Sequence, residues 1–192
     1  MSQEEIFAKG KIFELVHETQ PDGRIFEVAR RAPGVRIIID DKENKKILLT
    51  KEFRRELSAH DFRLPGGKVF NTLDEYSAYR EGGEDILAAA ESQAKVEAAE
   101  EAGIDISELQ LVRKSALGAT VEWDLYVFET LVWQPHKDGQ QLKDDEPQDI
   151  TDASFYDYAA VKKMILDGHM QEERIALILL QWITKQEQEN ES

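Results

Sequence analysis

Residues 85–102 constrain the fold of this chain most, because they read as one helix whose apolar positions are mostly alanine. A helix with so small an apolar face can pack very close to a sheet. The segments on both sides of it alternate between apolar and polar residues, as strands do, and two further helices follow near the end of the chain. This order predicts an α/β (α+β) protein with a mixed β-sheet between helical layers.

Turn-forming residues separate the strands that we expect in the first part of the chain. Residues 11–16 and 24–28 alternate like strands, and Pro21-Asp22-Gly23 between them is typical of a turn, so we expect a β-hairpin. Residues 35–39 and 46–50 predict a second hairpin. We therefore expect an N-terminal β extension over residues 1–33, a main domain over residues 34–184 and a frayed polar tail over residues 185–192.

Capping and periodicity predict the remaining elements. Thr72 and Glu75 fit a capping box, and Gly82-Gly83 would end a short helix of roughly ten residues. Gly103 is the expected stop of the alanine-rich helix. We then expect strands over residues 112–117, 125–133 and 150–156, one helix ending at Gly168 and another over residues 172–184.

Charge and composition exclude several classes of function. The chain has 192 residues with 24 basic and 39 acidic side chains, which gives a net charge of −15. We therefore expect neither a nucleic-acid nor a membrane partner, because so negative a surface repels both. The absence of cysteine excludes disulfides, zinc–thiolate sites and thiol catalysis. The first five residues lack the features of a signal peptide, which predicts a cytoplasmic protein.

Three glutamates share one face of the alanine-rich helix. Glu97, Glu100 and Glu101 are spaced i, i+3 and i+4, and like charges at this spacing destabilise a helix unless a cation lies among them. Hard divalent cations such as Mg²⁺ take oxygen ligands and would turn this repulsion into coordination. A solvated acidic helix face is the alternative, and the spacing alone favours that alternative.

The context of these glutamates changes that judgement. Leu64-Pro65-Gly66-Gly67-Lys68 precedes the helix, and Glu100-Glu101-Ala102-Gly103-Ile104 ends it. This combination resembles the Nudix hydrolases. The resemblance implies a Nudix-type α/β/α sandwich and Mg²⁺-dependent hydrolysis, with Mn²⁺ as the alternative ion, of the pyrophosphate bond in a nucleoside diphosphate derivative. Two monophosphates would be the products.

The resemblance also assigns ligands and shows three departures, one of which is Ala98 at a position that the family fills with a bulkier aliphatic residue. The resemblance implies that Glu97, Glu100, Glu101 and the carbonyl of Gly66 hold the metal, with Glu100 and Glu101 serving catalysis. Val96 stands where the family has an arginine that orients a glutamate. The loop before the helix also carries an extra segment, residues 70–83.

The missing arginine leaves two expectations. A cation such as Lys95 or Lys68 could replace it from nearby. Otherwise the glutamates would be held loosely and would bind Mg²⁺ weakly.

A finer resemblance, to the ADP-ribose and ADP-sugar pyrophosphatase branch, extends over most of the chain. Phe53-Arg54 matches an aromatic–arginine pair of that branch, which implies that Arg54 contacts the substrate phosphates, with Arg55 as its rival. Glu146, in an acidic loop, is the implied general base. Arg63 could meet another phosphate or lie outside the pocket. Phe26 is the candidate for holding the base by stacking.

The sequence leaves two other functions open. One is a Nudix-fold module that senses a nucleotide without cleaving it, which Val96 and the longer loop favour and the three glutamates oppose. The other is an acidic interaction protein with no ligand. We favour the enzyme, acting on a small molecule linked to a nucleoside diphosphate. Residues 1–33 hold too little apolar material for a core of their own, and related enzymes pair this region across a two-fold axis, so we expect a homodimer.

Overall fold

The structure is a computed structural model that describes residues 3–142 and 150–189. One central sheet is mixed: β4 (Gly34–Ile38) pairs in parallel with β10 (Leu125–Pro135), which pairs antiparallel with β8 (Ile104–Ser115). The predicted strand over residues 112–117 is thus longer, because β8 begins directly after the stop at Gly103.

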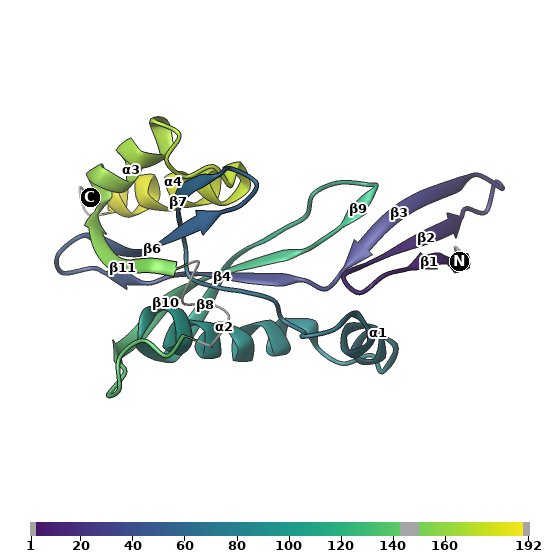
Figure 1. Ribbon diagram of the computed structural model, residues 1–192, viewed down its shortest axis with the longest axis horizontal. Coiled ribbons are helices and arrows are strands. Elements are labelled where there is room, and N and C mark those ends of the chain that lie inside the picture. The colour runs from purple at the N-terminus through teal and green to yellow at the C-terminus, as the bar shows by residue number, and fades with distance from the viewer. Residues whose placement is uncertain (1–2, 143–149, 190–192) are drawn as a thin grey trace.

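A second sheet adjoins the first. Its centre is β6 (Lys46–Arg54), which pairs antiparallel with β11 (Ile150–Asp157), with the short β5 (Asp40–Asp41) and with β7 (Ala59–Arg63). Figure 1 shows the helices on opposite sides of these strands, with α2 (Ile86–Ala102) below and the C-terminal helices above. The predicted α+β class, with a mixed sheet between helical layers, is confirmed.

The strand period of two sends alternate residues of β4 into two different cores. Ile37 packs with the alanine face of α2, whose Ala94 and Ala98 are both fully buried. Ile38 packs on the opposite side. Small alanine side chains let α2 lie close to β4, as the sequence predicts. This closeness brings the acidic end of the helix to the edge of the sheet.

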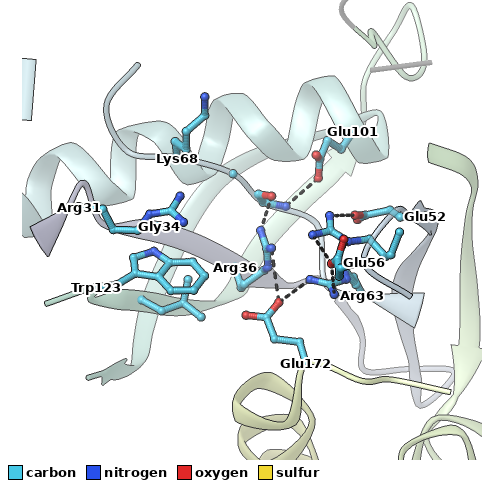
Figure 2. Close-up of a pocket in the computed structure, with 14 residues that line it drawn as sticks. Arg31, Gly34, Arg36, Glu52, Glu56, Arg63, Lys68, Glu101, Trp123 and Glu172 are labelled. Carbon is cyan, nitrogen blue, oxygen red and sulfur yellow. Dashed lines mark hydrogen bonds and ion pairs between the residues drawn. The ribbon is translucent and has the colours of Figure 1, made fainter. Parts of the chain in front are cut away.

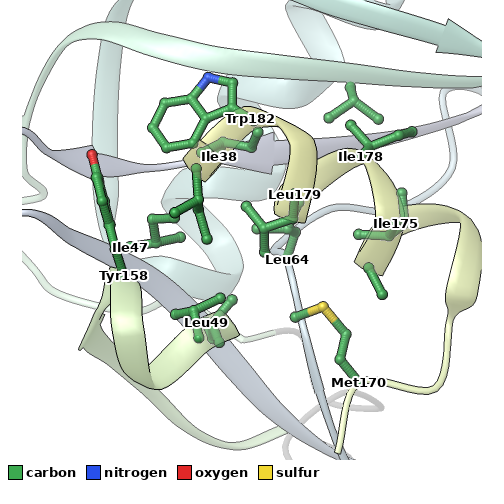
Figure 3. Close-up of a cluster of buried hydrophobic side chains, with 14 of the residues drawn as sticks. Ile38, Ile47, Leu49, Leu64, Tyr158, Met170, Ile175, Ile178, Leu179 and Trp182 are labelled. Atoms are coloured by element: carbon green, nitrogen blue, oxygen red, sulfur yellow. The ribbon is translucent and has the colours of Figure 1, made fainter. Parts of the chain in front are cut away.

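The opposite core is built by α3 (Tyr158–Leu166) and α4 (Glu173–Glu189). Figure 3 shows Leu179 and Trp182 of α4 lying over Ile38 and its neighbours. α4 continues through five residues of the segment that we expected to be a frayed tail. An ion pair between Lys162 of α3 and Glu187 of α4, at 2.7 Å, supports the C-terminal end of this helix.

The N-terminal extension forms its own sheet in the order β1-β2-β3-β9. Its strands are β1 (Gln3–Lys9), β2 (Phe13–Thr19) and β3 (Ile25–Arg31), joined by the short β9 (Val121–Glu122) of the main domain. The hairpin of β2 and β3 was predicted, whereas β1 was missed. Figure 1 shows this sheet projecting away from the rest of the molecule.

The segment inserted before the alanine-rich helix forms α1 (Leu73–Glu81). The capping box is present as predicted: the Thr72 side chain accepts from the backbone N–H of Glu75, and the Glu75 side chain accepts from that of Thr72. Gly82 ends the helix, and α2 begins after Asp85. Among the described residues, none of the helices is both long and apolar enough to cross a membrane.

Candidate active site

A pocket of about 450 Å³ lies where β4, β6 and the turn after β7 meet the start of α4. Figure 2 shows its charged lining, with Glu101 at one edge and Glu172 opposite. Four arginines, one lysine and four glutamates of the described chain line it, so cations outnumber acids by one here although the whole chain carries a charge of −15. A concentration of cations in one pocket of an acidic protein indicates an anionic ligand.

The turn Pro65-Gly66-Gly67 forms the edge of the pocket and runs beside β4. The backbone N–H groups of Val35 and Ile37 donate to the carbonyls of Gly67 and Pro65, both at 2.9 Å. Gly66 has a φ of 142°, and a Cβ there would come within 2.3 Å of the Val35 carbonyl oxygen. A Cβ on Gly67 would come equally close to Oε1 of Glu97. Only glycines let strand, turn and helix approach this closely.

Glu101 is the most deeply buried acid of the pocket, with 8% of its surface exposed. Its Oε2 accepts a hydrogen bond from the backbone N–H of Gly66 at 2.7 Å. Burial raises the pKa of Glu101 to about 8, and nearby Glu52 adds to the rise while the Gly66 hydrogen bond and Arg36 oppose it. Such a carboxylate gains stability from any cation brought beside it.

Glu97 lies one helical turn before Glu101 and is also buried. The side-chain amide of Gln93 donates to its Oε1 at 2.9 Å. Glu100 of the same helix is half-buried. In residues 3–142 and 150–189, no three acidic or histidine side chains are gathered closely enough to form a metal cluster. The donor set nonetheless fits a hard divalent cation in its chemistry, because two buried carboxylates contact one glycine turn.

Arg36 supplies a cation that contacts this turn. Its Nη1 donates to the carbonyl of Gly66 and, at 3.2 Å, to that of Val35, and its Nη2 lies 3.6 Å from Oε2 of Glu172. Lys95, which we considered as a replacement for the missing arginine, instead donates to the carbonyl of Ser107 at 3.3 Å. Sequence reasoning missed Arg36, although a charged residue inside the apolar run of β4 is a usable signal.

Arg54 and Arg63 both line the pocket, and their contact with substrate phosphates stays a prediction. The Nε of Arg54 donates to Glu56 at 2.9 Å. Arg63 is 8% exposed and is held by Asp61 at 3.0 Å and by Glu172 at 2.8 Å. The two arginines are therefore placed to meet an anion, while their present partners are carboxylates of the protein.

The other end of the pocket was not foreseen. The guanidinium carbons of Arg31 and Arg174 lie 4.3 Å and 4.6 Å from the centre of the Trp123 ring. Burial lowers the pKa of both arginines, and for Arg31 the charge of Arg174 adds to the effect. Lys68 also lines this end. Glu172 offsets part of this charge, because its Oε1 lies 4.0 Å from Nη2 of Arg174, whereas Arg31 forms no ion pair among the described residues. This end is therefore a second place for anionic groups.

Three of the predicted site residues that the structure describes, Glu97, Glu100 and Phe26, do not line this pocket. Phe26 lies on β3, is 40% exposed and does not line the pocket; its ring is contacted by the Arg24 guanidinium at 5.8 Å. Glu146 lies outside the described residues. The roles of Phe26 as base holder and of Glu146 as general base stay predictions.

Comparison with known proteins supports the fold. Neither a protein-family model nor a curated protein matches the sequence. Among solved structures, one described as an ADP compounds hydrolase matches with a TM-score of 0.62 over 96% of this chain and 93% of that chain. The two chains share a fold. At 18% sequence identity, the likeness concerns the fold alone.

Proposed function

We propose that the protein hydrolyses the pyrophosphate bond of a nucleoside diphosphate derivative, such as ADP-ribose or an NDP-sugar, to two monophosphates, with Mg²⁺ or Mn²⁺ as cofactor. The observation that carries the proposal is the contact of buried Glu97 and Glu101 with the Gly66-Gly67 turn, at the edge of an arginine-lined pocket. The solved structure that shares the fold is described as an ADP compounds hydrolase, which agrees with this proposal.

The metal would be held by Glu97, Glu100, Glu101 and the carbonyl of Gly66. A carbonyl oxygen has two lone pairs, so Gly66 can accept from Arg36 and still face a cation. A bound divalent ion neutralises phosphate charge and lowers the pKa of a water molecule.

The protein's own contribution is binding and orientation. Arg54 and Arg63 lie on one side of the pocket, and Arg31 lies at its other end, so a pyrophosphate would be contacted from both ends. Glu146 is our candidate for accepting the proton of the attacking water.

The test is a substrate panel with Mg²⁺, in which added phosphatase releases phosphate from the monophosphate products. The panel contains ADP-ribose, ADP-glucose, other NDP-sugars, NADH and dinucleoside polyphosphates. Glu101→Gln should lower kcat by at least ~100-fold, as expected for the loss of one preorganised electrostatic group. Glu91→Gln is the matched control, because Glu91 lies on the same helix but pairs with Lys95 at 3.5 Å. Equal activity of the two variants would contradict the site.

A non-catalytic nucleotide-sensing module is the second candidate. The observation that favours it is the lack of three gathered carboxylates among the described residues. The two candidates differ in one result. A sensing module would bind ADP-ribose, measured as a thermal shift, and would release no monophosphate from any member of the panel.

We also propose a homodimer formed through the N-terminal sheet. β1 is an edge strand, and two of its large apolar side chains are exposed, Ile6 (52%) and Phe7 (66%). Exposed apolar patches of this kind mark interaction surfaces. Light scattering at micromolar concentration should give twice the monomer mass. Phe7→Asp should give a monomer, whereas Leu166→Asp, at a position that is 76% exposed on α3, should not.

A further inference from the structure

A second pocket of about 230 Å³ adjoins the candidate active site. Arg31 and Lys68 line both pockets, so the two spaces meet at these cations. The rest of the second pocket comes from two places: Lys11 and Ile12, which lie between β1 and β2, and the start of the inserted segment.

The backbone explains why the two pockets meet. Lys68 forms a β-bridge with Gly34, and the N–H of Val69 donates to the carbonyl of Pro33 at 3.0 Å. The chain from Lys68 onward therefore runs beside the chain from Arg31 to Gly34, from one pocket into the other. Phe70 is the next residue along this path.

The inserted segment gives the second pocket a firm apolar wall. Leu73 is 4% exposed. The ring of Phe70 lies 5.5 Å from that of Tyr76 and 5.1 Å from that of Tyr79, which both belong to α1. The capping box at Thr72 fixes the start of this helix. The wall is thus anchored to α1 rather than carried by a loose loop.

The pocket has an apolar interior and a cationic rim. Ile12, Phe70 and Leu73 are its large apolar residues, and none of its described lining residues is acidic. Within the described parts of the chain, neither Arg31 nor Lys68 forms an ion pair, and the buried Nε of Arg31 has no hydrogen-bond partner. A ligand with an anionic group at the rim and an apolar ring in the interior would complement both parts of the pocket.

We propose that the second pocket holds the nucleobase of the substrate, while Arg31 and Lys68 bind the phosphoryl group that leads from it into the candidate active site. The assignment rests on the proposed function, which supplies the pyrophosphate. A volume of about 230 Å³ lies below the range of whole-ligand pockets, as expected for a space that takes one part of a larger ligand. Phe70, in place of the predicted Phe26, offers an aromatic contact to a base, because only Phe70 of the two lines this pocket. An apolar wall would leave sugar hydroxyls unpaired.

The experiment measures binding of two probes, ADP and inorganic pyrophosphate, to the full chain by calorimetry in EDTA, so that hydrolysis does not interfere. Ile12→Asn removes apolar surface from the second pocket without changing charge. Its control is Ile25→Asn: both isoleucines are 59% exposed and both lie in the N-terminal region, but only Ile12 lines the pocket. Light scattering of both variants shows whether the oligomeric state changes.

We expect Ile12→Asn to weaken ADP binding about four- to fifteenfold, the effect of losing one to two buried methylene groups, and to leave pyrophosphate binding within twofold. Arg31→Met should weaken binding of both probes. Ile25→Asn should change neither.

Three results would overturn the assignment: equal ADP affinities of the two asparagine variants, an equal loss of pyrophosphate affinity in Ile12→Asn, or no binding of either probe to the wild-type chain at millimolar concentration. Failure of the proposed function is distinct, because ADP could bind as described while no member of the substrate panel is cleaved. Conversely, cleavage with an Ile12→Asn KM equal to that of Ile25→Asn would leave the hydrolase standing and remove the second pocket from it.

Discussion

The burial of Glu101 predicts an unusual pH dependence of stability in the metal-free protein. Burial raises the pKa of this carboxyl from 4.5 to about 8 in the folded state. Between these two values the folded chain holds a proton that the unfolded chain has released. The free energy of unfolding therefore falls as the pH rises through this window.

The magnitude follows from the width of the window. One pH unit with a full proton difference is worth ~1.36 kcal/mol, and between pH 6 and pH 8 the difference shrinks as Glu101 ionises, which leaves about 2 kcal/mol. The pKa of Asp40 is also raised, to about 6. Its ionisation changes the free energy of unfolding mainly below pH 6, so the window from pH 6 to pH 8 reports mostly on Glu101.

The assay is urea denaturation in EDTA at pH 6, 7 and 8. Between pH 6 and pH 8, the free energy of unfolding of wild type and of Glu91→Gln should fall by about 2 kcal/mol more than that of Glu101→Gln, because glutamine at this position has no proton to release. Mg²⁺ should remove most of this difference, because a cation beside Glu101 favours its ionised form. If Glu101→Gln keeps the full slope, the carboxyl is not the titrating group. If Mg²⁺ leaves the wild-type slope unchanged, the metal does not bind beside it.

Two further substitutions test the packing that supports the site. Gly66→Ala should cost about 3 kcal/mol or more in urea denaturation, because its backbone has a φ of 142° and the added Cβ would come within 2.3 Å of the Val35 carbonyl oxygen; a loss below 1 kcal/mol would show that the turn can move. Leu179→Ala should cost about 3–5 kcal/mol, since this fully buried side chain lies in the core of α3 and α4; binding of ADP should be unchanged at temperatures where the variant is folded.

Local signals in the sequence were enough to predict most elements of the fold. The capping box at Thr72 and the stop at Gly103 each depend on residues within a few positions, and both are present in the structure. β1 was missed because Gln3, Glu4 and Glu5 begin it without alternation. Such an edge strand is defined by its pairing with β2, which its own sequence does not show.

The residues of the candidate site also fall into two groups, those that local spacing predicts and those that only the folded chain brings together. The glutamates of α2 could be named because i, i+3 and i+4 spacing places them on one face. Trp123 could not be predicted as a site residue, because Arg31 and Arg174, which contact its ring, lie far from it in the sequence. Contacts between distant segments depend on the packed fold, so spacing along the sequence carries no sign of them.

Arg36 brings a cation to the glycine turn from a strand rather than from α2. Val96 is 43% exposed on α2, whereas Arg36 reaches the Gly66 carbonyl from β4 and lowers the pKa of Glu101. Arg36→Met should therefore cost about 2–3 kcal/mol of stability, the value of charged hydrogen bonds, and should extend the pH slope beyond pH 8.

Two companion variants separate the charge of Arg36 from its geometry. Arg36→Lys keeps the charge but has no planar fork to bridge Gly66 and Glu172, so stability should fall while the slope still ends near the wild-type pH. Val96→Arg alone should change stability by less than ~0.5 kcal/mol, as expected at an exposed helix position. The same substitution added to Arg36→Met should restore nothing, because a side chain at that position starts on the solvent side of α2. Recovery of stability and of the pH slope in this double variant would mean that the helix position still reaches the glutamates, and that Arg36 does not act in its place.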